Sequence, residues 1–326
     1  MLSTLYAAAV RRRRERYAAR PELRRRLRRP VISVGNLAVG GRGKTPIAAS
    51  IARMLRDADE RPAILSRGYG RARPEAGVVV VRDPDGIRAD LARAGDEPLM
   101  LARQLPGVSV LACADRYLAG RLAEHHLGAT VHVLDDGFQH LQLDRDIDLL
   151  IVGRDDVLEP ATLPAGRLRE PLDTIIAADA VLTADDEVLV RASGAELPVF
   201  GIRRHGNVEP PAEVRGQPVV AVAGIASPER FFDDLRAGGW TLADTMTFRD
   251  HHRYTSRDVA RLLASAERLG AVRIVTTEKD LIRLLPFRPF RVPVVHVPIV
   301  LDPDPIEQFR EWLATELSTT RGDVRG

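Results

Sequence analysis

Apolar residues along most of the chain fall into two alternating kinds of run. Short runs of Val, Ile, Leu and Ala predict buried strands, and the stretches between them repeat apolar residues with the spacing of an amphipathic helix. The predicted strands are residues 31–34, 63–65, 77–82, 108–111, 130–134, 147–152 and 180–183, and the predicted helices are 47–56, 97–104 and 117–125. Strands that alternate with helices in this way indicate an α/β fold whose mostly parallel sheet is covered on both faces.

A second α/β series begins after residues 203–217, where Gly, Pro and charged residues replace any periodic pattern. Such a break predicts a domain boundary. Beyond it we expect strands at 219–223, 241–247, 273–276 and 294–297, with helices at 228–237, 256–268 and 305–317. The pattern therefore predicts two α/β/α domains, a larger one at residues 30–208 and a smaller one at residues 209–326 that closes a cleft against it.

The first 29 residues follow neither series. Their apolar residues are spaced as one stripe of a helix, and a run of arginines follows; the stripe is Leu2, Leu5, Tyr6, Ala9 and Val10. Residues 1–30 carry a net charge of +9 while the whole chain carries +3, so the remainder is mildly acidic. We expect a basic amphipathic helix at residues 1–29 that docks on an anionic membrane surface. A solvated basic helix and a nucleic-acid-binding arm are the alternatives, but no second basic patch follows and we expect no nucleic acid partner.

Composition adds three exclusions. The single cysteine, Cys113, excludes an intrachain disulfide and any site with several cysteine ligands, and it fits a reducing cytosol. No apolar run approaches the roughly 18 residues of a membrane span. A secretory signal places its charges before its apolar segment, whereas residues 1–29 have the reverse order, so we do not expect export.

Of 48 Lys and Arg residues, only Lys44 and Lys279 are lysines. Lys44 lies in a glycine-rich segment that resembles the phosphate-binding loop G-x-x-x-x-G-K-[ST], with alanine at the first position. Its residues are Ala38, Val39, Gly40, Gly41, Arg42, Gly43, Lys44 and Thr45. The loop follows a predicted strand and precedes a predicted helix, which is the setting that the motif requires. We therefore expect the first domain to be P-loop NTPase-like and to bind ATP, with Lys44 on the β- and γ-phosphates and Thr45 on Mg²⁺.

Carboxylates and histidines supply the other candidate chemistry. Asp135 and Asp136 end a predicted strand, where a phosphate-loop enzyme needs an acidic group for Mg²⁺, although Asp-Asp-Gly also favours a simple turn. Asp96 precedes a helix and could either cap it or align an acceptor hydroxyl. The pair His251 and His252 is weak support for a metal site, and an Asp–His pair that orients a catalytic group is the other interpretation.

Taken together these segments resemble the tetraacyldisaccharide 4′-kinase family of Gram-negative bacteria, over residues 31 to about 300. The motifs that carry the resemblance are V-G-N-L-A-V-G-G-R-G-K-T-P (34–46), S-R-G-Y-G (66–70), G-D-E-P (95–98), D-D-G-F-Q-H (135–140), L-R-E-P (168–171), A-G-I-A-S-P-E-R-F-F (223–232), F-R-D-H-H (248–252) and T-T-E-K-D (276–280). The loop is generic, but D-D-G-F-Q-H together with L-R-E-P is specific to that family.

The resemblance implies transfer of the ATP γ-phosphate to the 4′-hydroxyl of an acylated glucosamine disaccharide 1-phosphate, to give lipid IVA. It implies Mg²⁺ and a peripheral location at the cytoplasmic face of the inner membrane, with no obligate protein partner. The catalytic residues that it implies are Asp96, His251 and Asp136; it places Arg169 and Glu170 beside the nucleotide, and Thr45, Asp135 and Asp136 at the metal. A membrane-recruited switch ATPase and a non-enzymatic binding module are the rival interpretations.

Overall fold

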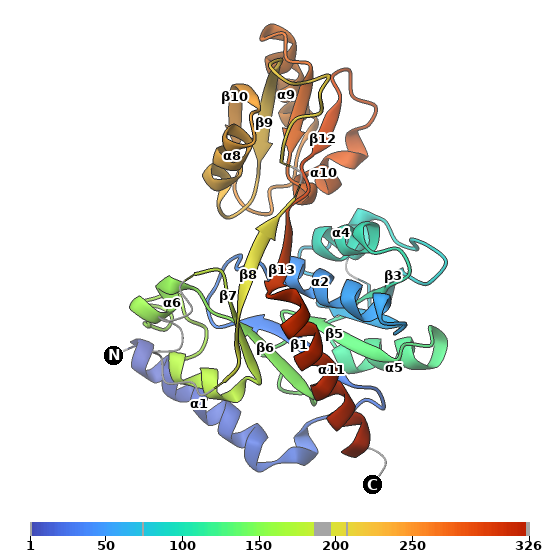
Figure 1. Ribbon diagram of the computed structural model, residues 1–326, viewed down its shortest axis with the longest axis vertical. Coiled ribbons are helices and arrows are strands. Elements are labelled where there is room, and N and C mark those ends of the chain that lie inside the picture. Colours follow the sequence, from blue (N-terminus) through green and yellow to red (C-terminus); the bar gives the residue numbers. More distant parts are fainter. Residues whose placement is uncertain (1, 74, 186–196, 207, 324–326) are drawn as a thin grey trace.

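The computed structural model describes residues 2–73, 75–185, 197–206 and 208–323. Within these residues, nine strands form a large sheet in the order β13-β8-β7-β6-β1-β5-β2-β4-β3 (Figure 1). The strands are β1 (Val31–Asn36), β2 (Pro62–Ser66), β3 (Val79–Arg82), β4 (Ser109–Ala112), β5 (Val131–Asp135), β6 (Ile147–Ile151), β7 (Ala180–Thr183), β8 (Val199–His205) and β13 (Val300–Asp304). All neighbouring pairs are parallel except those of the two edge strands, β3 with β4 and β13 with β8.

Apolar residues on both faces of the central strands explain why helices cover the large sheet on both sides. Ile32 and Val34 of β1 join a core with α2 (Lys44–Asp57), α4 (Asp96–Gln104) and α11 (Ile306–Asp323). Val31, which points to the opposite face, joins a second core with α5 (Arg116–His126). The structure also has two shorter helices, α3 (Leu91–Ala94) and α6 (Arg154–Leu158), and 3₁₀ turns at Pro21–Leu23, Leu172–Ala177 and Leu285–Phe287.

A smaller parallel sheet forms the upper part of the molecule in Figure 1, in the order β10-β9-β11-β12. Its elements are β9 (Pro218–Ala223), α8 (Pro228–Ala237), β10 (Thr241–Thr247), α9 (Ser256–Arg268), β11 (Arg273–Thr276), α10 (Glu278–Leu284) and β12 (Val294–His296). Helix α8 buries Phe231, Phe232 and Leu235 against one face, and α9 packs on the other. Helices on both faces of each sheet confirm the expected α/β/α architecture.

The end of the chain does not stay with the smaller sheet, which differs from the expected assignment of residues 209–326 to one smaller domain. Strand β13 returns to the large sheet and pairs antiparallel with β8, so that Val300 lies opposite His205. Helix α11 then buries Phe309, Leu313 and Leu317 in the core of the large sheet. Beta-pairing between segments so far apart leaves no local pattern, so periodicity alone could not reveal it.

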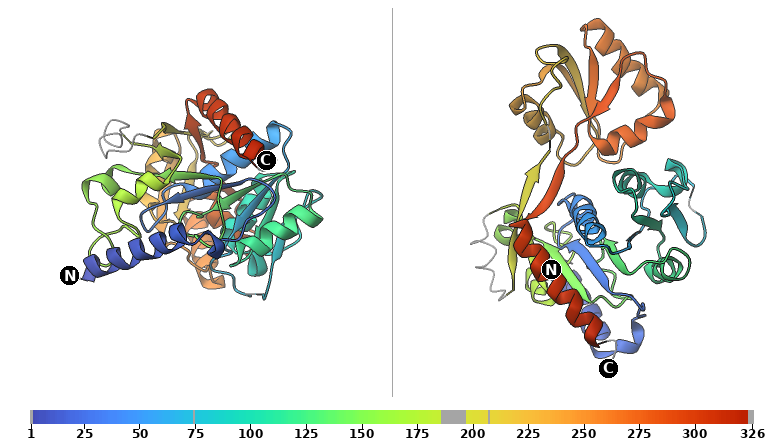
Figure 2. Two further views of the ribbon diagram at one scale, coloured as in Figure 1. Left: turned by 90° about the horizontal axis from the view of Figure 1, so that it is seen from below. Right: turned by 45° about the vertical axis from the view of Figure 1, so that its right-hand side comes forward.

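The N-terminal helix α1 (Leu2–Ala19) is present as expected, and it lies on the opposite side of the large sheet from α11 (Figure 2, left). Its apolar residues do not share one environment: Tyr6 and Val10 are half-buried against the protein, whereas Leu2 and Leu5 are 70% and 64% exposed. Across the described part of the chain, none of the helices combines the length and the apolar character needed to cross a bilayer.

Candidate functional site

The glycine-rich loop joins β1 to α2, and its backbone takes turns that favour glycine. Gly43 precedes α2 with a φ of 83°, in the left-handed region. A Cβ at this position would lie 2.6 Å from Leu301 Cδ1 of β13, so any other residue would also have to displace the end of that side chain. The other side of the loop is fixed by the backbone, because Val39 N–H donates to Arg167 O at 2.8 Å. The loop is therefore held open at the start of a helix, where its N–H groups can face phosphate oxygens.

Lys44 occupies the centre of a small polar network. Its Nζ donates to Asn36 Oδ1 at 3.0 Å and to Gly40 O at 3.3 Å, and lies 3.6 Å from Asp136 Oδ1. Arg169 donates to both oxygens of Asp136, at 2.9 and 3.1 Å, and also to Asn36. Burial opposes ionisation of Asp136, but its bond to Arg169 and the charge of Lys44 outweigh burial and lower the pKa of its carboxyl. Asp136 thus orients the two cations that would face the phosphates.

The second carboxylate, Asp135, turns toward the start of α2. Thr45 Oγ1 lies 3.2 and 3.1 Å from its two oxygens. Burial, followed by the charges of Glu97 and Asp136, raises the pKa of Asp135 to about 7. A hydroxyl beside a buried carboxylate with too little positive charge around it suits a hard cation such as Mg²⁺. The described residues hold no group of three or more His, Cys, Asp or Glu side chains placed to bind a metal.

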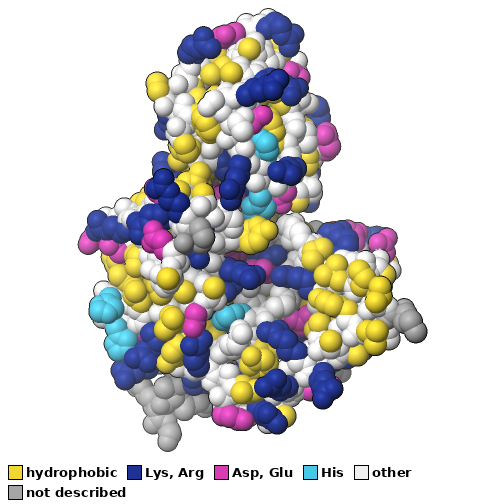
Figure 3. Space-filling view, turned by 180° about the vertical axis from the view of Figure 1, so that it is seen from behind, with side chains coloured by type: hydrophobic (Ala, Val, Ile, Leu, Met, Phe, Trp, Pro, Cys, Tyr) yellow, Lys and Arg dark blue, Asp and Glu magenta, His cyan; other side chains and the backbone are white. Residues whose placement is uncertain are grey.

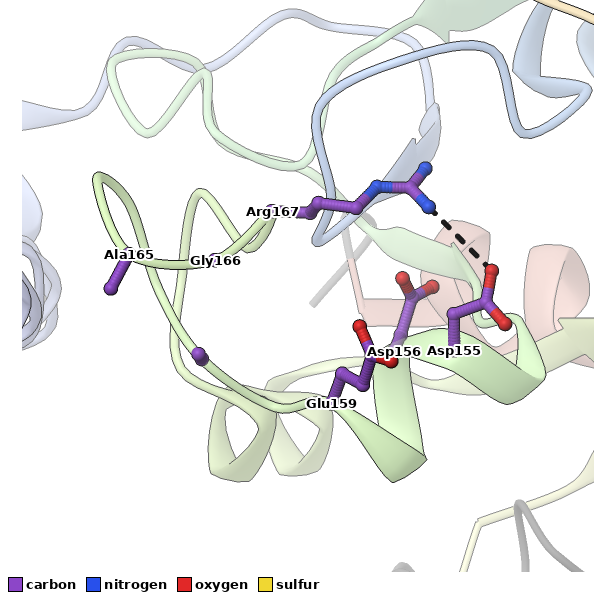
Figure 4. Close-up of a pocket in the computed structure, with 7 residues that line it drawn as sticks. Asp155, Asp156, Glu159, Ala165, Gly166 and Arg167 are labelled. Carbon is purple, nitrogen blue, oxygen red and sulfur yellow. Dashed lines mark ion pairs between the residues drawn. The ribbon is translucent and has the colours of Figure 1, made fainter.

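A pocket of about 280 Å³ opens beside the loop, lined by Asp155, Asp156, Glu159, Ala161, Ala165, Gly166 and Arg167 (Figure 4). Arg167 reaches across it to Asp155 at 3.5 Å. Arg42 of the loop points the same way and pairs with Asp156 at 2.7 Å. With three carboxylates and one arginine, the lining of this pocket does not suit phosphate. Arg42 therefore anchors the loop through an ion pair, a role that its sequence position did not reveal.

A second polar cluster gathers around Asp96, the first residue of α4, which is only 8% exposed. Its Oδ2 accepts from Arg283 Nε at 2.8 Å and from Arg283 Nη2, and it lies 3.1 Å from His251 Nδ1. Its Oδ1 accepts from the backbone N–H of Glu97 at 3.0 Å. Burial opposes ionisation, but the bond from His251 and the charges of Arg283 and Lys279 outweigh it and hold the pKa of Asp96 well below its usual range. The carboxylate is therefore charged at neutral pH.

The two vicinal histidines have different surroundings. His251 has a φ of 57°, so its backbone turns sharply and brings the ring to Asp96, with the Tyr69 ring edge-on at 5.6 Å. His252 instead faces Asp258 Oδ2 at 3.1 Å and stacks on Phe248. Left-handed backbone outside glycine is uncommon and concentrates at functional sites. The structure thus brings His251, the histidine favoured from the sequence, to Asp96 and leaves His252 at the start of α9.

The Asp96 cluster lies next to the loop. The carboxylate of Glu97, one residue along α4, is close enough to raise the pKa of Asp135. Ala226, which follows β9, would lie 3.9 Å from a Cβ placed on Gly41, so the smaller part of the molecule comes close to the glycine-rich loop. Seen from behind, the molecule is hollowed between its upper and lower parts, and Lys and Arg side chains gather around that recess (Figure 3). Both clusters therefore border one site between the two sheets.

Glu170, which was expected beside the nucleotide, is instead engaged by the N-terminal helix. Glu170 is buried, and its carboxylate accepts a hydrogen bond from Arg14 Nε of α1 at 2.5 Å. The Arg14 guanidinium also stacks over the Phe138 ring. Tyr6 of α1 donates to Arg169 O at 3.0 Å. Glu170 therefore ties the N-terminal helix to the loop region. Asn36 and Arg283 are the functional-site residues that residue-by-residue reasoning missed; Asn36 lies within the V-G-N segment, and Arg283 lies one helical turn after Lys279.

Comparison with known proteins extends the similarity over the whole chain. The family model described as tetraacyldisaccharide-1-P 4′-kinase matches residues 1–318. The chain is 41% identical over 328 residues to the tetraacyldisaccharide 4′-kinase of Geobacter metallireducens, covering 94% of this chain and 95% of that one. It is 40% identical over 325 residues to that of Geobacter sulfurreducens, covering 94% and 90%. The solved structure of apo-form LpxK from Aquifex aeolicus in complex with ATP matches with a TM-score of 0.80 and 33% identity over 97% of both chains.

Proposed function

The chain belongs to the tetraacyldisaccharide-1-P 4′-kinase family, and from that premise we propose how its residues phosphorylate the lipid acceptor. The enzyme transfers the γ-phosphate of ATP to the 4′-hydroxyl of a tetraacylated glucosamine disaccharide 1-phosphate, in the biosynthesis of lipid A. The observation that carries the proposed division of labour is the contact of His251 with Asp96, the first residue of a helix whose next residue, Glu97, carries a charge that acts on Asp135 beside the glycine-rich loop.

The loop and its neighbours hold the nucleotide. Backbone N–H groups of the loop and the Lys44 ammonium face the phosphates, while Arg169, fixed by Asp136, adds a second cation. Thr45 and Asp135 are the residues that would hold Mg²⁺, which neutralises charge on the β- and γ-phosphates when bound. These groups are positioned before the reaction begins, so they stabilise charge as it develops without rearranging.

Asp96 aligns the acceptor. Among the described residues, three N–H groups of Arg283 and His251 surround Oδ2, whereas Oδ1 accepts one bond, from the backbone of Glu97, so Oδ1 has a lone pair for the 4′-hydroxyl. A lone pair of the hydroxyl oxygen forms the bond to the γ-phosphorus. The bond from that phosphorus to the bridging oxygen breaks and leaves its electron pair on ADP. The hydroxyl proton passes to Asp96 Oδ1 and then to water, late in the transfer because the carboxylate is a weak base.

Substitution of Asp96 tests this assignment, and the chain provides a matched control. Asp96→Asn should lower kcat by about 10²–10⁴-fold while ATP still binds, because the loop is untouched. The control is Asp258→Asn, which alters the other Asp–His pair, also at 3.1 Å but at the start of α9. Labelled ATP with the acylated disaccharide in mixed micelles gives the rates. Near-normal lipid phosphorylation by the Asp96 variant would refute the assignment, and release of free phosphate without an acceptor would favour a switch ATPase.

We also propose that α1 docks the enzyme on the anionic cytoplasmic face of the inner membrane, as a peripheral protein. Leu2 and Leu5 expose aliphatic surface, and the neighbouring arginines of residues 11–16 are mostly exposed. An acceptor whose acyl chains lie in a bilayer must be reached at the surface. Each arginine near an anionic surface contributes roughly 1 kcal/mol, and salt weakens the attraction.

A further inference from the structure

Lys279, in the first turn of α10, lies at the point where three acceptors converge. Its Nζ is 3.0 Å from His251 Nε2, 3.1 Å from Glu97 Oε1 and 3.5 Å from Asp250 Oδ1. Its side chain is only 16% exposed, so these contacts are sheltered from water. An ammonium has three N–H donors arranged around one atom, which matches three acceptors around one point; the planar fork of arginine does not. This explains why a chain with 46 arginines has a lysine here.

The contact with Lys279 decides which nitrogen of His251 carries the proton. A lysine ammonium can only donate, so His251 Nε2 must accept and bears no hydrogen. The neutral ring then carries its proton on Nδ1, which faces Asp96 Oδ2 at 3.1 Å. The charged carboxylate can only accept, so these two contacts agree. Arg283 Nη2 also lies near Nδ1, but at 3.4 Å this contact is longer than the 3.1 Å to Asp96, and Nη2 already donates to Asp96 Oδ2. With the opposite tautomer an N–H would face the ammonium and a bare nitrogen would face the carboxylate.

Arg283 supports this arrangement from the other side. Its Nη1 donates to Gly224 O at 2.9 Å and to Asp280 Oδ1 at 3.1 Å, while Nε and Nη2 hold Asp96 Oδ2. Arg283 therefore fixes where Oδ2 lies, while the backbone N–H of Glu97 holds Oδ1. His251 is the third donor to Oδ2, and Lys279 is what keeps its Nδ1–H directed there.

We propose that Lys279 is a positioning residue of the phosphoryl transfer: its ammonium fixes His251 in the Nδ1–H tautomer, which directs the free lone pair of Asp96 Oδ1 toward the acceptor hydroxyl. The inference rests on the proposed roles of Asp96 and His251. Lys279 lies in the smaller part of the molecule and Asp96 in the larger, so the alignment exists only when α10 packs on α4.

Lys279→Gln tests the inference in the full-length protein. We expect kcat to fall by up to about 10²-fold with the Kd for ATP unchanged, because a misplaced acceptor costs rate without disturbing the loop. The matched control is Glu278→Gln, since Glu278 accepts from Gln104 across the same α4–α10 contact but does not touch His251. An equal loss of kcat in both variants would mean that packing of α10 is responsible, and would overturn the proposal.

The tautomer itself can be measured with ¹⁵N-labelled histidine, because the chain has eight histidines and a His251→Gln sample assigns the relevant signals. In the wild type, the His251 signals should show protonated Nδ1 and bare Nε2. In Lys279→Gln, the proton should move toward Nε2. An unchanged His251 tautomer in that variant would overturn the proposal, whatever the rate, since a purely structural role predicts no change.

A chemically modified cysteine can restore an ammonium group at position 279. Lys279→Cys treated with 2-bromoethylamine gains a thioether-linked ammonium of lysine length, as the thiolate displaces bromide. The one natural cysteine, Cys113, is buried, so the reaction is directed to position 279. Recovered kcat supports the inference and absent recovery contradicts it. Full turnover by Asp96→Asn or His251→Gln would refute the proposed site itself, whereas loss in those two with full activity in Lys279→Gln would refute only the role of Lys279.

Discussion

At the scale of single residues, His140 makes the stability of the protein depend on pH. Its ring is partly buried near two guanidinium groups, those of Arg116 and Arg145. Burial, reinforced by these two charges, lowers the pKa of His140 to about 4. An unfolded histidine has a pKa near 6.5, so between these values the unfolded chain binds a proton that the folded protein does not. The free energy of unfolding therefore falls as the pH drops from 6.5 toward 4.

His140→Gln should remove this dependence. From pH 7 to pH 4.5 the wild type should lose about 2 kcal/mol more unfolding free energy than the variant, a figure reduced for the partial exposure of the ring. Urea titrations of both proteins at the two pH values provide the measurement, and each protein serves as its own reference at pH 7. Parallel losses in the two proteins would show that His140 gains its proton in the folded state as readily as in the unfolded chain.

At the scale of elements, α1 acts both as an anchor inside the protein and as an exposed surface. Arg14 binds Glu170, and Tyr6 binds the backbone of Arg169, so deleting the helix would leave the buried carboxylate of Glu170 without its partner. Leu2 and Leu5 point away from these contacts. Point substitutions on the outer side therefore separate membrane binding from support of the site, which removal of the whole helix cannot do.

Leu2→Ser with Leu5→Ser should weaken binding to vesicles that contain anionic lipid by at least about tenfold, because burial of each leucine in the interface contributes roughly 1.5–3 kcal/mol. Binding of ATP should be unchanged. Co-sedimentation with vesicles that contain phosphatidylglycerol, compared with neutral vesicles, measures the effect. Ile87→Ser, at a 40% exposed side chain beside β3, serves as the control. Equal vesicle binding by the wild type, the Leu2/Leu5 double variant and the Ile87 variant would show that α1 is not part of the docking surface.

Local sequence predicted most elements and the loop, since β1, α2 and β5 each leave a periodic signal and a motif. It did not predict the pairing of β13 with β8, nor the contact of Arg14 with Glu170, which joins residues 156 apart. The same holds for Arg283 and Asp96, which are 187 residues apart. Such contacts depend on how finished elements pack, and a charged side chain looks the same in sequence whether it binds a partner or water.

At the scale of the whole molecule, the smaller sheet is an insertion between two adjacent strands of the large one. The chain leaves at the end of β8 and returns at the start of β13, where His205 and Val300 are partners. Asp302 of β13 accepts a hydrogen bond from the Ser50 hydroxyl of α2, and its other oxygen lies 2.5 Å from His205 Nε2. The strand that leaves the large sheet and the strand that returns to it are therefore both linked to the helix that follows the loop.

Joining His205 to Val300 through a two-residue turn should give a shortened protein that folds and binds ATP, since antiparallel neighbours accept such a turn. It should transfer no phosphate to lipid, because it lacks His251, Lys279 and Arg283. Circular dichroism, ATP titration and the micelle assay test the three parts. Retention of lipid phosphorylation would contradict the proposed roles of these residues, and failure to bind ATP would show that the loop depends on the smaller part.

The return of the chain also sets an order of assembly during synthesis. Ser50 and its partner Asp302 are 252 residues apart, and the core beneath α2 is completed only by α11. All four strands of the smaller sheet leave the ribosome before β13 does. The smaller sheet can therefore fold before the large one. The nucleotide-binding part cannot complete its core until β13 and α11 have been synthesised.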